Sequence, residues 1–163
     1  METGFPSLED TDLQYLLLKE FCDRYYPLLE YTQLDKVLSV HDEVHDEVHD
    51  GDKVWKEAVQ LRAYVVPAAQ AYPLTVFGIE ELRDAVLQVS VPNLLAVELA
   101  TRDESSKVVE LVATVGDRFT FNDELYEVLV WRIGQTFANT DVPLLFAANC
   151  VKVHFPASPY QGL

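Results

Sequence analysis

The clearest chemical pattern in the sequence is a histidine repeat, His41-Asp-Glu-Val-His45-Asp-Glu-Val-His49. If this segment is helical, the three imidazoles lie one turn apart and could chelate a borderline metal such as Zn²⁺. If it is extended, the histidines share a face with Glu43 and Glu47. Nothing around the repeat supplies the fixed supporting partners that a metal site needs. We therefore interpret the repeat as a solvated acidic loop without metal or cofactor. A metal site on His41, His45 and His49 is the alternative.

The rest of the sequence lacks the residue patterns of common catalytic sites. It contains no glycine-rich dinucleotide or phosphate loop, no CxxC, no HExxH and no GxSxG. His154 is the one histidine outside the repeat, and its apolar surroundings favour a packing role. The adjacent acidic pairs Glu80-Glu81 and Asp123-Glu124 lie in stretches typical of turns or loops. These observations favour a protein that is not an enzyme.

The charge of the chain is strongly negative and unevenly distributed. Its 12 Lys and Arg residues stand against 27 Asp and Glu residues, a net charge of −15 over 163 residues. Residues 1–52 hold 14 of the acidic and three of the basic residues, which leaves −11 there and −4 in the remainder. Binding to nucleic acid through phosphates depends on Lys and Arg. The composition therefore argues against a protein that grips DNA.

The sequence also bears on the compartment in which the chain folds. Its N-terminus, Met1 to Pro6, has no basic residue, and no long apolar stretch follows, so we expect no secretory signal. Apolar runs such as residues 142–148 are too short to span a membrane. Cys22 and Cys150 lack metal-like spacing. We interpret them as reduced, buried thiols of a protein made in the cytoplasm, with no membrane partner.

Helical signals are confined to the N-terminal part of the chain. Ser7-Leu8-Glu9-Asp10 resembles a capping box, and Pro27 predicts the end of the helix that this box begins. The apolar residues between them recur at helical spacing: Leu13, Leu16, Leu17, Phe21 and Tyr25. The segment 28–40 is ambiguous, because a second short helix fits its leucines while its β-branched residues weaken that assignment.

After residue 52 the pattern predicts short strands. Residues 54–65 and 84–91 alternate apolar and polar side chains, and Pro92-Asn93 is typical of a turn. Further strands are predicted over 107–114, 118–121, 125–131 and 144–155, with a hairpin turn at 122–124. We expect a mainly β fold, a small antiparallel β-barrel or sandwich with an N-terminal helical segment. Its parts would be an acidic segment (1–52), the β domain (53–155, with a loop over 67–84) and a tail (156–163).

Two stretches of this predicted domain carry a resemblance to a known family. The first is Leu61-Arg62-Ala63-Tyr64-Val65, then Pro73-Leu74-Thr75-Val76-Phe77-Gly78-Ile79-Glu80, Arg83-Asp84 and the strand over 87–91. The second is Gly116-Asp117-Arg118-Phe119-Thr120-Phe121, Leu125-Tyr126-Glu127-Val128 and Ala138-Asn139-Thr140-Asp141-Val142-Pro143-Leu144. Over residues 54–154 the chain resembles the head-completion, or stopper, proteins of tailed-bacteriophage necks.

The resemblance implies a structural virion protein located in the phage neck. Such a protein forms a homo-oligomeric ring, contacts a portal or adaptor protein on one side and a tail or tail-terminator protein on the other, and lets DNA pass without tight binding. A tail-terminator or adaptor ring without a gating role is an alternative. An alternative of another class is a metal-binding regulatory β-barrel that uses the histidine repeat.

Two groups of residues are the candidate functional sites. Apolar side chains in the long loop predict an oligomer or partner interface, although a lid packed on the domain itself fits them equally well: Tyr72, Leu74, Phe77 and Ile79. The acidic side chains of the repeat would face the channel, solvent or a partner: Asp42, Glu43, Asp46, Glu47 and Asp50. Negative groups at a channel wall repel DNA over about a Debye length, on the order of 10 Å.

Overall fold

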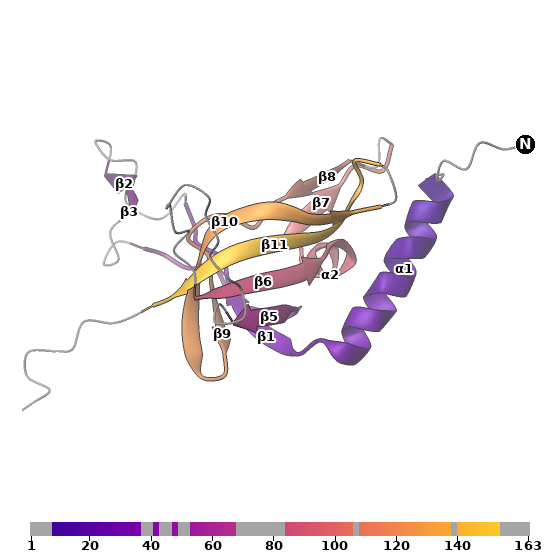
Figure 1. Ribbon diagram of the computed structural model, residues 1–163. Helices are drawn as coiled ribbons and strands as arrows, with labels where there is room; N and C mark the ends of the chain where they lie inside the picture. The colour runs from indigo at the N-terminus through magenta and orange to yellow at the C-terminus, as the bar shows by residue number, and fades with distance from the viewer. Residues whose placement is uncertain are drawn as a thin grey trace, which may run out of the picture.

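The computed structural model shows a mainly β protein (Figure 1) and describes residues 8–36, 41–42, 47–48, 53–67, 84–105, 108–137 and 140–153. Its elements, in chain order, are α1 (Leu8–Tyr25), β1 (Leu28–Thr32), β2 (His41–Asp42), β3 (Glu47–Val48), β4 (Val59–Arg62), β5 (Tyr64–Pro67), β6 (Ala85–Ser90), α2 (Val91–Ala96), β7 (Ala100–Arg102), β8 (Val109–Leu111), β9 (Arg118–Phe121), β10 (Glu124–Thr136) and β11 (Pro143–Lys152).

Seven strands form one antiparallel sheet in the order β4-β1-β9-β10-β11-β6-β5. The two edge strands, β4 and β5, are separated along the chain by Ala63 alone. Arg62 pairs with Leu28 on one side of this junction, and Tyr64 pairs with Gln88 on the other. The two edges of the sheet therefore lie one residue apart at this point, so the sheet curls around its core. Two-stranded ribbons β2–β3 and β7–β8 complete the strands of the described residues.

The core lies inside this curled sheet. The strands predicted over residues 54–65 and 84–91 are confirmed in part: the first begins only at Val59 and is divided by Ala63 into β4 and β5, and the second is β6. The predicted apolar side is buried, Val59 only partly, but Val86 and Ser90 on the other side of β6 are buried as well. The largest side chains with almost no exposed surface are Tyr31, Phe119, Leu61, Leu87, Leu94, Val89, Val91 and Val128. They come from strands that are distant in sequence and from α2, so antiparallel pairing brings the core together.

Helix α2 corrects one prediction. Pro92-Asn93 was expected to form a turn, but both residues lie in the first turn of α2. The side-chain oxygen of Ser90 accepts a hydrogen bond from the Asn93 amide (3.3 Å) and caps this helix. Proline is well suited to the position, because the amide that it lacks would have no partner inside the helix there.

Two further sequence predictions, the end of α1 and the β9–β10 hairpin, are confirmed, and two others are corrected. Helix α1 ends before Pro27, as predicted. The hairpin between β9 and β10 is confirmed, with Asn122 and Asp123 at φ of 50° and 62°, as a tight two-residue turn requires. The ambiguous segment after Pro27 begins with strand β1 rather than a second helix, because it pairs with both β4 and β9. The strand predicted over 107–114 is reduced to β8.

The two cysteines are free and fully buried. Burial raises the pKa of the Cys150 thiol to about 12 and raises the pKa of the Cys22 thiol above its usual range. Both groups are therefore protonated at neutral pH. The prediction that these residues are buried thiols is confirmed.

Alkaline pH is expected to lower the free energy of unfolding. In the unfolded chain a thiol ionises near pH 8.5, whereas the folded chain holds the Cys22 and Cys150 protons to higher pH. Burial raises the pKa of the Tyr31 hydroxyl in the same direction. The folded state thus retains protons that the unfolded state loses, so stability falls as pH rises above about 8.5. Urea unfolding at neutral pH and at about pH 10 measures the change; equal free energies would contradict it.

Candidate interaction surface

Helix α1 packs mainly on α2 and meets the sheet at β6, through one face of the helix (Figure 1). The residues on that face include Thr11, Tyr15 and Cys22, which are buried. The Tyr15 hydroxyl donates a hydrogen bond to the Pro143 carbonyl at 2.7 Å, which ties the helix to the start of β11. Arg102 reaches from β7, pairs with Asp12 at 2.7 Å and stacks over the Tyr15 ring. These contacts hold α1 in place and decide which of its faces is turned outward.

The opposite face of α1 exposes the apolar residues whose spacing predicts the helix. Leu13 is 56% exposed, Leu16 58%, Leu17 52% and Phe21 50%. An amphipathic helix ordinarily turns such a stripe toward the core. In this chain the smaller and more polar side of α1 faces the core, and the stripe faces away from it.

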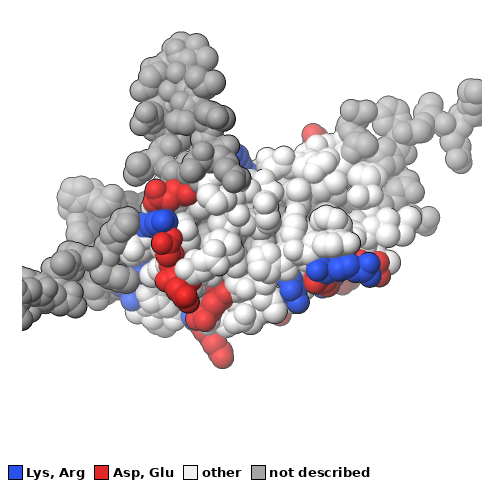
Figure 2. Space-filling view, turned by 60° about the horizontal axis from the view of Figure 1, so that its bottom comes forward, with Lys and Arg blue, Asp and Glu red and all other residues white. Residues whose placement is uncertain are grey.

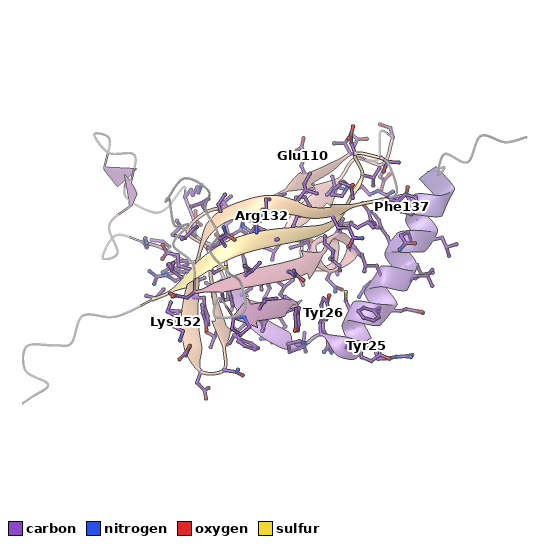
Figure 3. The ribbon with its side chains drawn as sticks, in the orientation of Figure 1. Tyr25, Tyr26, Glu110, Arg132, Phe137 and Lys152 are labelled. Carbon is purple, nitrogen blue, oxygen red and sulfur yellow. The ribbon has the colours of Figure 1, made fainter. Side chains whose placement is uncertain are left out.

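Aromatic side chains extend this exposed stripe beyond the end of the helix. Phe21 contacts Tyr25 (ring centroids 4.9 Å apart) and Tyr26 (6.1 Å), and Tyr26 stacks on Tyr64 of β5 at 5.6 Å. Figure 3 labels Tyr25 and Tyr26 at this end of α1. We call the whole set the α1 surface: Leu13, Leu16, Leu17, Phe21, Tyr25, Leu28 and Tyr64, each between 47% and 64% exposed.

The α1 surface is large for a protein that works alone. Half-exposed leucines and aromatic residues present roughly 100 Å² each, so seven of them present on the order of 700 Å². The largest apolar patch of a typical monomer is about 300–600 Å², and one side of a standard interface buries about 800 Å².

The sequence signal for this surface was the helical spacing of its apolar residues, but that pattern does not say which face of the helix turns outward.

Charged residues accompany the apolar ones on α1. Lys19 and Asp23 form an ion pair at 2.7 Å. Glu20 and Arg24 are exposed, and neither has an ion pair in the part of the chain that the structure describes. Helix α1 as a whole holds five acidic residues against Lys19 and Arg24, a net charge of −3. On the face shown in Figure 2, charged side chains border a broad uncharged area.

A second exposed region lies on the distal half of β10. Strand β9 pairs with β10 only over Glu124–Glu127. Beyond Val128, β10 is bonded to β11 on one edge, and its other edge has no strand partner among the described residues. Val130 is 45% exposed and Ile133 52%. Arg132, labelled in Figure 3, is also exposed and forms no ion pair within the described residues.

The Gly-Asp-Arg-Phe stretch of the resemblance has a structural role in this fold. Asp117 is fully buried, and its carboxylate accepts hydrogen bonds from the Tyr31 hydroxyl (2.6 Å), the Leu34 amide (2.9 Å) and the Thr114 amide (2.8 Å). Burial raises the pKa of Asp117, and these donors oppose the rise. Gly116 has φ of +92°, a conformation that favours glycine. The carboxylate thus joins two loops to β1.

The next two residues of the stretch also stabilise the fold. Arg118 bonds Glu127 at 3.0 Å across the β9–β10 hairpin, and its guanidinium lies 4.7 Å from the centre of the Trp55 ring. Phe119 is 1% exposed and stacks on Tyr126, with ring centroids 5.2 Å apart. The stretch therefore joins β1, β9 and β10.

The apolar loop predicted as an interface lies outside the described residues, with Tyr72, Leu74, Phe77 and Ile79 all between 68 and 83. Its role remains a prediction.

The histidine repeat is described only in part. His41 and Asp42 form β2, and Glu47 and Val48 form β3, with His41 opposite Val48 and Asp42 opposite Glu47. The helical alternative is therefore wrong for these four positions. His154 lies outside the described residues. So do the other repeat residues that were predicted as sites: Glu43, His45, Asp46, His49 and Asp50. Within the described ranges, no three His, Cys, Asp or Glu residues are grouped closely enough to hold a metal ion.

A cavity of about 450 Å³ lies on the β7–β8 ribbon. Its lining mixes one guanidinium with two carboxylates: Thr101, Arg102, Asp103, Val108 and Glu110. The Nε and Nη2 atoms of Arg102 are buried and lack hydrogen-bond partners among the described residues. Asp103 and Glu110 place negative charge at the same cavity, which disfavours an anionic ligand.

Comparisons with known proteins give no relative. No family model, no curated protein and no solved structure matches the chain. Neither helix of the described residues is long and apolar enough to cross a membrane.

Proposed function

We propose that this chain is a structural, non-enzymatic protein of a phage neck that assembles with copies of itself into a ring. The ring would lie between the portal or adaptor and the tail, close the filled head and let DNA pass. The observation that carries the proposal is the α1 surface, since an apolar area of this size on a well-packed domain is typical of a protein that functions in an assembly. The family resemblance supplies the identity of that assembly.

The sheet supports the architecture expected for such a ring subunit. Edge strands β4 and β5 meet across Ala63, whose amide donates to the Pro27 carbonyl at 3.1 Å. We infer that the seven strands form a small closed barrel in which one bent segment, β4 followed by β5, pairs with β1 by its first half and with β6 by its second. Closure removes exposed sheet edges and favours a rigid subunit.

The charge supports a channel through which DNA slides. A net charge of −15, most of it before residue 53, repels phosphates instead of binding them. The acidic residues of the repeat would line or approach the channel. The apolar loop around Leu74 and Phe77 would contact the portal, the adaptor or a neighbouring subunit.

The test is the assembly state and DNA affinity of the purified full chain. We expect ring-shaped oligomers by light scattering and negative-stain electron microscopy, and no retention of duplex DNA at about 0.15 M salt. A monomer that binds duplex tightly under the same conditions would overturn the proposal. Titration with Zn²⁺ tests the metal-binding alternative, which predicts stoichiometric binding. Electron microscopy of the rings with a portal protein separates a stopper from a tail terminator, since only the stopper occludes the channel.

A further inference from the structure

We propose that the α1 surface of one copy docks on the distal half of β10 of the next copy, head to tail. This inference rests on the proposed ring and identifies the contact that builds it. We call the receiving region the β10 surface and define it by Val130 and Arg132, which share one face of the strand, and by the edge over residues 129–136, which has no strand partner among the described residues.

The size of the α1 surface matches one side of a stable interface. Its roughly 700 Å² is close to the 800 Å² that each partner contributes to a standard complex. Its centre holds leucines and aromatic rings, the residue types that dominate binding energy in such interfaces. Lys19 and Asp23 border the apolar residues, whereas Glu20 and Arg24 lie among them, one turn from Leu16 and Leu17 and from Phe21.

Charge explains why the occupant is a second copy. Two chains that each carry −15 repel one another, so a stable contact between them needs local attraction that offsets this repulsion. Helix α1 holds five acidic residues against Lys19 and Arg24, a net charge of −3, and residues 129–136 contain Arg132 and no acid, so the two regions attract each other. Glu20 and Arg132 are both exposed without an ion pair among the described residues, so each is available to the other across the interface.

Geometry explains why the contact runs head to tail. A ring needs two different patches on each subunit, because contacts that use one patch twice end at a dimer. The two surfaces belong to different elements, α1 beside the sheet and β10 within it (Figures 1 and 3). No strand of the described residues covers the edge of β10 over residues 129–136, so the leucines of α1 can approach this edge and pack against Val130.

Disulfide cross-linking tests this arrangement. Two single variants, Leu17→Cys and Val130→Cys, each place one thiol on one surface, and the native cysteines are fully buried and do not compete. We expect a disulfide-linked pair only when the two variants are mixed and oxidised. A pair formed by Leu17→Cys alone would overturn the head-to-tail arrangement in favour of two α1 helices facing each other. Absence of any cross-link in an assembled sample would overturn the inference as well.

Charge insertion gives the matched control. Leu17→Asp is expected to weaken assembly at least about tenfold, whereas Val115→Asp, at a residue of nearly equal exposure (53% against 52%) outside both surfaces, leaves it unchanged. Circular dichroism verifies that both variants fold. If the wild-type chain assembles and Leu17→Asp assembles equally well, this inference fails while the ring proposal stands. If the wild-type chain is a monomer, both fail.

Discussion

Asp117→Ala is expected to lower the free energy of unfolding by about 3–5 kcal/mol. The substitution removes the acceptor of three hydrogen bonds, from the buried Tyr31 hydroxyl and Leu34 amide and from the partly buried Thr114 amide. Each donor is then removed from water without forming a hydrogen bond that offsets the loss. Because these donors lie in β1 and in two loops, the loss also loosens the entry to β9. Urea unfolding followed by tryptophan fluorescence measures the difference.

Tyr31→Phe is the matched control for this prediction. It removes one of the donors and keeps the carboxylate, the two amide bonds and the ring that fills the core. We expect a loss of about 1 kcal/mol. If Asp117→Ala were no more destabilising than Tyr31→Phe, the carboxylate would not be the centre of this network. The Gly-Asp-Arg-Phe stretch would then need another explanation than stability.

The strands were predictable where the pattern is local. The strands around Leu61 and Leu87, and the turn-forming pair Asn122-Asp123 between aromatic strands, depend on neighbouring residues and are confirmed. Residues 28–32 were not predictable in this way. Their leucines fit either period, and the strand forms because β4 and β9 supply hydrogen-bonding partners from 30 and 90 residues further along the chain.

The candidate interaction surface shows where spacing alone is insufficient. The leucines of α1 predict a helix, and by the usual rule they predict its buried face. Thr11, Tyr15 and Cys22 occupy that face instead, and Tyr15 and Cys22 form specific bonds to Pro143 and Ser90. A sequence pattern records that a face is apolar, but whether it packs within the chain or against a partner depends on tertiary contacts. The exposed half of β10 is a comparable case, because among the described residues its edge lacks a strand partner only beyond the point where β9 ends.

Phe119→Ala is expected to lower the free energy of unfolding by about 3–5 kcal/mol. The ring is 1% exposed and stacks on Tyr126, so its removal leaves a cavity that the rigid strands around it cannot fill. Its position adds to the effect. Strand β9 has only four residues, yet it is the element that joins β1 and β4 to the β10–β11 pair. A weakened β9 therefore interrupts the hydrogen-bonded sheet between β1 and β10.

Thr120→Ala is the control in the same strand. Thr120 is exposed, and it pairs through its backbone with Glu30 and Leu125, so the substitution keeps the ladder on both sides. We expect a change within about 0.5 kcal/mol. Chemical unfolding of the two variants, with circular dichroism and tryptophan fluorescence recorded together, measures both effects. A loss below about 1 kcal/mol for Phe119→Ala would show that β9 is not the link on which the continuity of the sheet depends.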